Sequence, residues 1–389
     1  MEKVAGADPG SGRVRGAERN ETMIRHLYVH IPFCHRICPY CSFYKHEPGS
    51  TDTAAFLRAL TAELEADRSG ERAIETVYFG GGTPTLISAG HLERWLPEFV
   101  RVAGIDRGLV EWTVEVNPRT ITERKAAVLR EAGVTRVSLG VQSWDAEVLA
   151  TLGRDHSPAE AEEAWRVLRG AGFEAVNVDL MFSVPGQTIE SWRETLDRTL
   201  AFGPDHVSAY NLTYEEDTAF FERFQRGEYG RDEVVDEAYF REVMERTAAA
   251  GMVHYEISNY ARPGYESRHN QGYWAGADYL GIGPGAVSTV ARRRWKNLEN
   301  TVLYMERALG GMTVLQPATV EELDESAWSC ERIALELRTA RGVDCGYLPE
   351  LARAEETTAG GLTREEGGRL VLTERGKYVA DSVAAHLWA

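Results

Sequence analysis

Short apolar segments alternate with amphipathic segments through the first half of the chain. The strand-like segments are residues 27–31, 76–79, 111–116, 136–140, 175–181 and 206–212. Helical periodicity occupies stretches between them, for example residues 51–66, 123–132, 158–171 and 189–201. Six successive β–α units predict a parallel sheet covered by helices, because right-handed crossovers bring consecutive strands side by side. The Val-, Leu- and Tyr-rich strands fit a sheet that is buried on both faces.

The pattern changes after residue 213. A polar helical stretch continues to about residue 250, and a short strand-like segment follows at residues 254–260. The segment from residue 269 to residue 288 is rich in aromatic residues and glycine.

From about residue 321 the chain has the pattern of a small helical module. A strand at residues 370–373 and a final helix at residues 374–387 are typical of a winged-helix-like bundle. Such a bundle binds nucleic acid through basic residues on one face, and this one carries no basic stripe. We therefore expect it to pack against the rest of the chain or to contact a protein.

The composition is that of an ordinary globular protein, with 43% hydrophobic and 26% charged residues among 389. No apolar run approaches the roughly 20 residues that cross a bilayer, and no secretory signal precedes the cysteines. The net charge of −17 argues against general binding to nucleic acid. We expect a cytoplasmic protein without a transmembrane segment.

The N-terminal residues are rich in Gly, Arg and Glu and show no apolar periodicity. This composition predicts a disordered tail over residues 1–25. Met23 directly precedes an apolar run, so Met23 is an alternative start to Met1.

Three of the five cysteines, Cys34, Cys38 and Cys41, lie in one short segment with the spacing C-x3-C-x2-C. Three thiolates can hold a [4Fe–4S] cluster and leave one iron atom without a protein ligand. Such an iron atom can bind a small molecule, whereas a fully ligated cluster suits electron transfer alone.

Two other interpretations of these cysteines fit less well. A structural zinc site needs four tetrahedral ligands; His35 or His46 could supply the fourth, but no second ligand pair follows. A disulfide framework is disfavoured because the cysteine total is odd and Cys330 and Cys345 are far away in sequence.

Polar and glycine residues follow the ends of the predicted strands. The cysteine segment follows the first strand and the sequence G-G-G-T-P-T, residues 80–85, follows the second. Glu115, Gln142 and Asp179 lie near the ends of the next three strands. Since parallel strands end at one edge of the sheet, these residues are expected to form one ligand site there.

These motifs resemble those of the radical S-adenosylmethionine (SAM) superfamily. The sequence Y-V-H-I-P-F-C at residues 28–34, together with residues 80–85, resembles the group that contains oxygen-independent coproporphyrinogen III oxidase and the HemW haem chaperones. The resemblance extends over residues 26–389. It implies an α/β fold, a partial (β/α)6 TIM-like barrel over residues 26–235, with a C-terminal α+β, winged-helix-like helical extension over residues 236–389.

The same resemblance implies that a [4Fe–4S] cluster on Cys34, Cys38 and Cys41 binds the amino and carboxylate groups of SAM. An electron from the cluster then cleaves the sulfonium group. The residues expected to hold SAM are Gly82 and Thr83 at the amino group, Glu115 at the amino group or a ribose hydroxyl, Arg154 at the carboxylate, Gln142 and Asp179 at the ribose, Tyr40 at the adenine, and Tyr28, Thr213 and Val287 along the pocket. Each of them could instead be an ordinary surface or core residue, and Gly80–Gly82 could form only a tight turn.

Two features distinguish members of this group. In the oxidase group the cysteine motif is C-x3-C-x2-C-x-C, with a further cysteine two positions after the third. This chain has Phe43 at that position. The sequence H-N-Q-G-Y-W at residues 269–274 matches the H-N-x-x-Y-W motif of HemW-type chains. The chain also has no extended folded segment ahead of the first strand, as the oxidase would. These features favour the HemW group.

A haem carrier needs aromatic surface, basic groups for the propionates and an optional axial ligand. The haem-binding candidates are His269, Asn270, Tyr273 and Trp274, with Tyr279 as further aromatic surface and Arg262 or Arg268 for the propionates. His269 is the candidate iron ligand because imidazole suits haem iron. Alternatively, His269 orients a loop through hydrogen bonds and Trp274 belongs to the core.

We therefore expect a haem chaperone that passes haem to an acceptor protein and receives electrons for its cluster from a donor. The sequence does not identify the acceptor, which could be a membrane protein contacted transiently. The alternative is an enzyme that oxidatively decarboxylates coproporphyrinogen III, or a radical SAM enzyme acting on another tetrapyrrole. We expect that this chain is not a coproporphyrinogen III dehydrogenase.

Overall fold

The computed structural model describes residues 23–105 and 108–389. The predicted disorder of residues 1–22 lies outside the described residues. Strand β1 (Met23–Ile31) already begins at Met23, three residues before the predicted boundary at residue 26.

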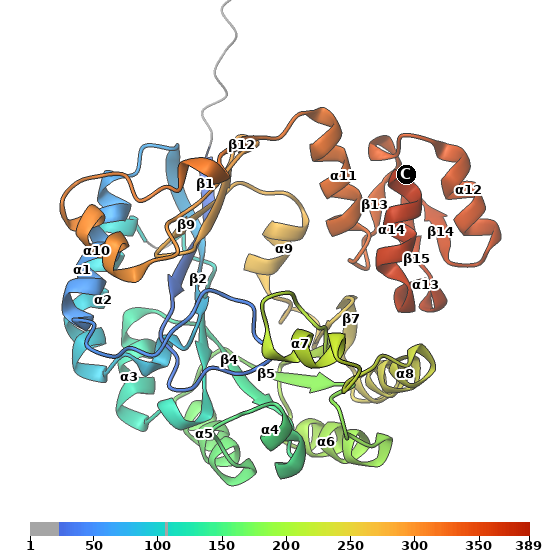
Figure 1. Ribbon diagram of the computed structural model, residues 1–389, viewed down its shortest axis with the longest axis horizontal. Coiled ribbons are helices and arrows are strands. Elements are labelled where there is room, and N and C mark those ends of the chain that lie inside the picture. The colour runs from blue at the N-terminus through green and yellow to red at the C-terminus, as the bar shows by residue number, and fades with distance from the viewer. Residues whose placement is uncertain (1–22, 106–107) are drawn as a thin grey trace, which may run out of the picture.

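The six predicted strands all form, and they pair in parallel in chain order. The strands after β1 are β2 (Glu71–Gly81), β3 (Glu111–Val116), β4 (Arg136–Gln142), β5 (Ala175–Phe182) and β6 (His206–Asn211). The helices between them are α1 (Thr53–Ala66), α2 (Ala89–Ala103), α3 (Glu123–Ala132), α4 (Ala146–Thr151), α5 (Pro158–Gly170) and α6 (Ile189–Ala201). The predicted α/β fold of the partial-barrel type is thereby confirmed. Figure 1 shows the helices around the outside of the curved sheet.

Both ends of the parallel sheet are extended by later parts of the chain, which gives a sheet of 12 strands. Next to β1 the order is β9 (Tyr279–Ile282), β10 (Val287–Val290), β11 (Arg293–Lys296) and β12 (Glu321–Glu322). Next to β6 lie β8 (Asn259–Ala261) and β7 (Val253–Glu256). Strand β9 is parallel to β1, whereas β8 is antiparallel to β6.

The prediction of a single strand at residues 254–260 was wrong, because β7 and β8 are the two arms of a hairpin. The side chain of Glu256 accepts hydrogen bonds from the Ser258 backbone N–H at 2.9 Å and from Asn259 Nδ2 at 2.6 Å. These bonds stabilise the turn between the two strands, and local propensity alone did not reveal it.

Side-chain caps explain where the outer helices begin. Asp52, Ser88, Thr122, Ser157 and Thr188 each accept a backbone N–H of the first turn of their helix. Each cap satisfies a donor that would otherwise lack an intrahelical partner.

The two faces of the sheet differ in chemistry. In β1, Leu27, Val29 and Ile31 belong to the main hydrophobic core, while the alternate residues are His26, Tyr28 and His30. The polar interior continues across the sheet, where His206 Nδ1 lies 2.6 Å from Asn177 Oδ1. The sheet is therefore buried between an apolar outer layer and a hydrogen-bonded interior.

The second half of the chain adds α7 (Ala219–Gln225), α8 (Glu233–Ala249), α9 (Arg268–Trp274) and α10 (Thr301–Leu309). The predicted boundary between residues 235 and 236 falls in the first turn of α8, which packs on α6. The hydrophobic cluster of the C-terminal region begins only at Ile333.

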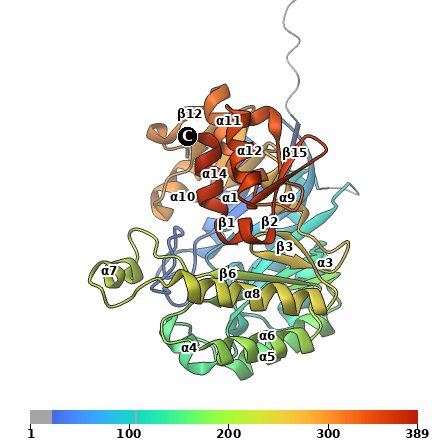
Figure 2. The same ribbon diagram turned by 90° about the vertical axis from the view of Figure 1, so that its right-hand side faces the viewer.

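That cluster belongs to a C-terminal module, which lies to the right of the barrel in Figure 1 and in front of its upper part in Figure 2. It comprises α11 (Glu325–Glu336), β13 (Val343–Asp344), α12 (Leu351–Ala359), β14 (Thr363–Glu366), β15 (Arg369–Leu372), α13 (Glu374–Tyr378) and α14 (Ala380–Trp388). The prediction of a single final helix at residues 374–387 was wrong, because Val379, with φ −126° and ψ 31°, separates α13 from α14. Among the helices of residues 23–105 and 108–389, none is both long and apolar enough to cross a membrane.

Phe99 of α2 is fully buried against Phe79, Trp95 and Trp112. We expect Phe99→Ala to lower the free energy of unfolding by about 3–5 kcal/mol, because it removes apolar contacts and leaves a cavity. Urea unfolding followed by circular dichroism would measure this loss. The exposed neighbour Glu98 is the control, and a Phe99→Ala variant as stable as Glu98→Ala would contradict the expectation.

Candidate functional site

The segment that carries the three cysteines leaves the end of β1 and is hydrogen-bonded to the loop that follows β2. The backbone N–H of Gly82 donates to the Ile31 carbonyl at 2.8 Å, and that of Thr83 donates to the Phe33 carbonyl at 2.7 Å. A Cβ atom at position 82 would lie 2.7 Å from the Phe33 oxygen. Glycine is therefore required for this close backbone approach.

Further contacts fix the cysteine loop internally and against α7. The backbone N–H of Cys34 donates to the His46 carbonyl at 3.0 Å, and that of Cys41 donates to the Cys38 carbonyl at 3.2 Å. The Phe220 N–H of α7 donates to the Pro39 carbonyl at 3.0 Å. All three cysteine side chains are half-buried.

Burial raises the pKa of Cys34 to about 11 and also raises the pKa of Cys41. These groups are therefore neutral thiols near neutral pH, and iron must displace their protons on binding. In residues 23–105 and 108–389, no three His, Cys, Asp or Glu side chains are arranged to hold one metal ion. The zinc interpretation therefore has no assembled ligand set there; the thiolates of a [4Fe–4S] cluster bind separate iron atoms and need not meet at a point.

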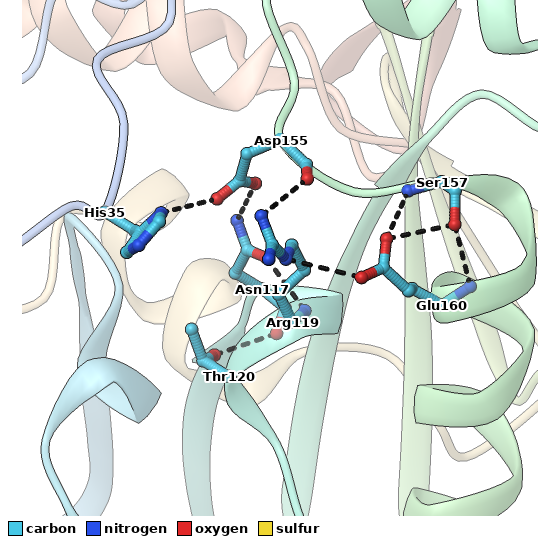
Figure 3. Close-up of polar contacts among 7 residues, drawn as sticks. All are labelled: His35, Asn117, Arg119, Thr120, Asp155, Ser157 and Glu160. Atoms are coloured by element: carbon cyan, nitrogen blue, oxygen red, sulfur yellow. Dashed lines mark hydrogen bonds and ion pairs between the residues drawn. The ribbon is translucent and has the colours of Figure 1, made fainter.

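The cysteine loop is tied to the loops after β3 and α4 (Figure 3). His35 Nδ1 lies 3.2 Å from Asp155 Oδ2, and Asn117 Nδ2 donates to Asp155 Oδ1 at 3.4 Å. Arg119 donates to the Asp155 carbonyl at 3.0 Å and forms an ion pair with Glu160 at 3.3 Å. Three chain segments are joined through Asp155.

Glu115 lies at the end of β3 and faces the glycine run. Its carboxylate accepts a hydrogen bond from the Tyr78 hydroxyl at 2.8 Å and one from the Gly81 N–H at 3.2 Å. Burial raises the pKa of Glu115 to about 7, while the hydrogen bond from Tyr78 acts in the opposite direction. A Cβ atom at Gly80 would lie 2.9 Å from Glu115 Oε1, so the glycine leaves room for this carboxylate.

Arg154 reaches back from the loop after α4 to the cysteine loop. Its Nη2 donates to the Gly140 carbonyl at 2.9 Å, and its Nη1 lies 3.8 Å from Cys38 Sγ. Its Nε is buried and has no hydrogen-bond partner. Because buried donors are nearly always paired, this group is available to a ligand.

Gln142 is the last residue of β4, whereas Asp179 lies within β5, three residues before the end of that strand. Gln142 has φ 66°, an uncommon conformation for a residue other than glycine, and the β4–β5 register is interrupted there. Asp179 accepts hydrogen bonds from Ser138 at 2.8 Å and Asn177 at 2.7 Å, and burial raises its pKa.

The remaining residues predicted to hold SAM differ in how far they are buried and in what they contact. The ring of Tyr28 stacks on that of Tyr78 with centroids 6.1 Å apart, and Tyr40 packs near Phe220 with centroids 6.2 Å apart. Thr213 is exposed and donates to Glu215 at 2.7 Å. Val287 opens β10 and is half-buried.

The four haem-binding candidates lie on α9, away from the cysteines. His269 is fully buried, with its Nδ1 2.8 Å from Thr76 Oγ1. Thr76 precedes Gly81 by five residues in β2, a distance of about 17 Å along a strand. For His269 to ligate haem iron, α9 would have to move away from β2, whereas the alternative role of orienting a segment needs no movement.

Asn270, Tyr273 and Trp274 are half-buried. The ring of Tyr273 lies against His269, with centroids 4.7 Å apart, and against Tyr279, with centroids 4.4 Å apart. The opposite side of α9, which includes Trp274, borders a cavity.

This cavity, of about 670 Å³, lies between α9 and the C-terminal module. Trp274, Tyr255 and Tyr347 contribute aromatic side chains to its lining. Arg369 forms ion pairs with Glu336 at 2.5 Å and with Asp344 at 3.8 Å, while Arg341 is exposed. The volume of this cavity is in the range of about 300–1,000 Å³ that is usual for pockets of drug-sized ligands.

Sequence reasoning missed Tyr78, Thr76 and Glu111, which connect α9 to the strand-end residues. Thr76 and Tyr78 share the interior face of β2 because side chains alternate along a strand. Alternation of polar and apolar residues in β2 was the available signal, but it resembles that of an ordinary half-buried strand.

The chain is similar to known proteins in both sequence and fold. The model of the radical SAM superfamily matches residues 28–199. A protein named "Heme chaperone HemW" from Mycobacterium tuberculosis is 40% identical over 370 residues, which cover 93% of this chain and 94% of that protein. The protein of the same name from Bacillus subtilis is 32% identical over 377 residues, covering 92% and 98% of the two chains.

Among solved structures, coproporphyrinogen III oxidase (HemN) from Escherichia coli superposes with a TM-score of 0.81 at 22% identity. The match covers 95% of this chain and 91% of the oxidase. At this identity it shows the common fold.

We expect Cys34→Ala, Cys38→Ala and Cys41→Ala each to abolish the visible absorption of a reconstituted iron–sulfur cluster, because each removes one of three thiolate ligands. Iron and sulfide content after anaerobic reconstitution would be measured alongside the spectrum. Cys330→Ala, which changes a cysteine of the C-terminal module, should retain full cluster content. Full cluster content in any variant of the three-cysteine loop would contradict the ligand assignment.

Proposed function

Because the chain belongs to the HemW family of the radical SAM superfamily, we propose that it is a haem chaperone, which binds haem and delivers it to an acceptor protein. The observation that carries this proposal is the 40% identity to a protein named heme chaperone over 94% of that protein's length. The relationship therefore extends over 93% of this chain.

A [4Fe–4S] cluster on Cys34, Cys38 and Cys41 and a SAM molecule beside it belong to the proposal. The residues around the cysteine loop suit both groups, because they offer three half-buried thiols, an arginine Nε without a partner and a half-buried carboxylate. When bound, the cluster and SAM supply one-electron reductive chemistry.

The protein's own residues bind and orient the cofactor. Arg154 offers its free Nε to the SAM carboxylate, and Glu115 accepts from the amino group. Asp179, which pairs with Gly140 within the sheet, and Gln142 at the end of β4 would accept from and donate to the ribose hydroxyls. Tyr40, Tyr28, Thr213 and Val287 complete the proposed pocket.

We place the haem in the cavity beside Trp274. Aromatic side chains from α9 and from the C-terminal module offer the apolar surface that a macrocycle needs, and Arg341 offers a cation for a propionate. The ion pairs of Arg369 offset the charges of Glu336 and Asp344 in the same wall. The prediction that His269 ligates the iron stays a prediction, and it requires a different position of α9.

The alternative function, oxidation of coproporphyrinogen III, receives no support from position 43. Phe43 is 66% exposed beside the cysteine loop. An aromatic residue therefore stands at the position of the further cysteine in the motif of the oxidase group.

The partners in this proposal are haem, an acceptor protein, and an electron donor for the cluster. The acceptor can be a membrane protein that is contacted transiently, and nucleic acid is not proposed as a partner. None of the five cysteines, all of which are described, forms a disulfide, and this supports the proposed cytoplasmic location.

Incubation of the cluster-loaded protein with coproporphyrinogen III, SAM and a reductant, without oxygen, separates the two functions. We expect no catalytic formation of protoporphyrinogen IX. In parallel, we expect the protein to bind haem stoichiometrically and to transfer it to an apo-haemoprotein. Absorption spectroscopy would measure both the binding and the transfer. Catalytic turnover, or failure to bind haem, would refute the chaperone function.

Matched variants locate the haem in the same experiment. Trp274→Ala and Arg341→Glu should each weaken haem binding by about tenfold, because they remove a stacking surface and a cation (about 1.4 kcal/mol per factor of ten). Arg94→Glu in α2 is the control, since Arg94 is also an exposed arginine and lies away from the cavity. Unchanged affinity in both cavity variants would place the haem elsewhere.

Glu115→Gln should weaken SAM binding to the cluster-loaded protein by about tenfold, because an amide cannot attract the SAM ammonium as a carboxylate does. Since the pKa of Glu115 is raised to about 7, its carboxylate gains charge as the pH rises through that value. Wild-type affinity for SAM should therefore increase between about pH 6 and about pH 8, and the variant should lack this increase. Equilibrium dialysis of labelled SAM would measure both, with the exposed Glu123→Gln as control. An equal pH dependence in Glu115→Gln would remove Glu115 from this role.

A further inference from the structure

Helix α9 closes the interior of the half-barrel at the end opposite the cysteine loop. Its N-terminus is held by Glu111, the first residue of β3. The Glu111 carboxylate accepts from the backbone N–H groups of Arg268 and His269, each at 3.0 Å, and from the Ser267 hydroxyl at 3.4 Å. A buried carboxylate at the first turn of a helix satisfies free donors and complements the helix dipole, so the position of α9 is fixed relative to β3.

His269 inserts from α9 into the interior of the sheet. The Thr76 hydroxyl lies 2.8 Å from Nδ1 of His269 and 2.7 Å from Nδ1 of His26. A hydroxyl carries one proton, so it donates to one of these rings and accepts from the other. Thr76 thereby orients the His269 ring between α9 and β1.

There is no room for α9 to shift towards β1. A Cβ atom at Gly272 would lie 2.5 Å from His26 Nε2. The glycine allows the helix to approach until the two histidine rings meet edge to face at 5.9 Å.

The ring of His269 packs on Tyr78, with centroids 5.2 Å apart and planes inclined by 31°. Tyr28 packs on the same tyrosine, with centroids 6.1 Å apart. A tyrosine has only two side-chain torsions, so these ring contacts determine where its hydroxyl lies. That hydroxyl donates to Glu115 Oε1 at 2.8 Å.

We propose that His269 is a positioning residue for the SAM site, which sets the Glu115 carboxylate through Tyr78. The chain of contacts runs from α9 to His269, then to Tyr78 and finally to Glu115. This role rests on the proposed SAM site and is distinct from ligation of haem iron, because the imidazole is fully buried. Helix α9 thus faces the SAM site with His269 and the cavity with Trp274.

The test compares SAM binding, haem binding and thermal stability in one set of variants of the cluster-loaded, full-length protein. We expect His269→Ala to weaken SAM binding by about tenfold, because Tyr78 loses its packing partner and its hydroxyl no longer holds Glu115. The SAM-induced change in the electron paramagnetic resonance spectrum of the reduced cluster should diminish, while the iron content stays at the wild-type value. Tyr78→Phe, which retains the ring and loses the hydroxyl, should have the same effect on SAM with little loss of stability.

A double-mutant cycle tests whether His269 acts through Tyr78. If it does, the His269→Ala/Tyr78→Phe protein binds SAM no more weakly than Tyr78→Phe alone. The control is His254→Ala, since His254 also stacks on a tyrosine, Tyr260, with centroids 4.3 Å apart, but contacts the C-terminal module through Lys377. It should lower the melting temperature without changing SAM binding.

Several results would overturn the inference. Additive losses of SAM affinity would show that the two residues act independently. Normal SAM binding in His269→Ala would exclude the positioning role, whether or not haem binding is lost. If His269→Ala does not fold, the same comparison uses His269→Gln, which keeps a polar group near Thr76 but removes the ring. Failure of the wild-type protein to bind SAM would instead refute the proposed SAM site itself.

Discussion

The close backbone contact between the loops that follow β1 and β2 determines the site. Two N–H groups, from Gly82 and Thr83, donate to carbonyl groups of Ile31 and Phe33, so the cysteine loop is fixed to the neighbouring strand end. The same glycine run brings Gly81 against Glu115. The backbone of the cysteine loop and the Glu115 carboxylate are thus both held by the same short segment, Gly81–Thr83. A side chain at position 82 would disturb both at once.

The rest of the architecture follows from the different chemistry of the two sheet faces. Apolar residues point outwards to the helices, while histidine, asparagine and carboxylate side chains fill the interior with hydrogen bonds. Such an interior is costly unless nearly every polar group is paired. The unpaired groups, such as Arg154 Nε and His269 Nε2, therefore mark candidate functional positions. Arg154 Nε lies at the proposed cofactor site, and His269 Nε2 lies at the opposite end of the barrel interior, on α9.

The parallel core was predictable from sequence because each of its six strands is a short apolar run between amphipathic helices. The positions of Glu115 and Gln142 close to the ends of β3 and β4 were also visible in the sequence, whereas their role in holding a cofactor stays a prediction. The hairpin of β7 and β8 could not be predicted, because it depends on the bonds of Glu256 to residues in the turn. The position of α9 was also hidden. Its N-terminus is held by Glu111, which is more than 150 residues earlier in sequence.

The sheet ends at one side in β12, which consists only of Glu321 and Glu322, and at the other in β7, which has four residues. An open sheet exposes unpaired backbone groups along its outermost strands, and these can recruit strands from other molecules. A two-residue strand of like charge offers little to such pairing. The half-barrel can thus stay open towards a cofactor without becoming a template for aggregation, a hazard that closed barrels avoid by joining their first and last strands.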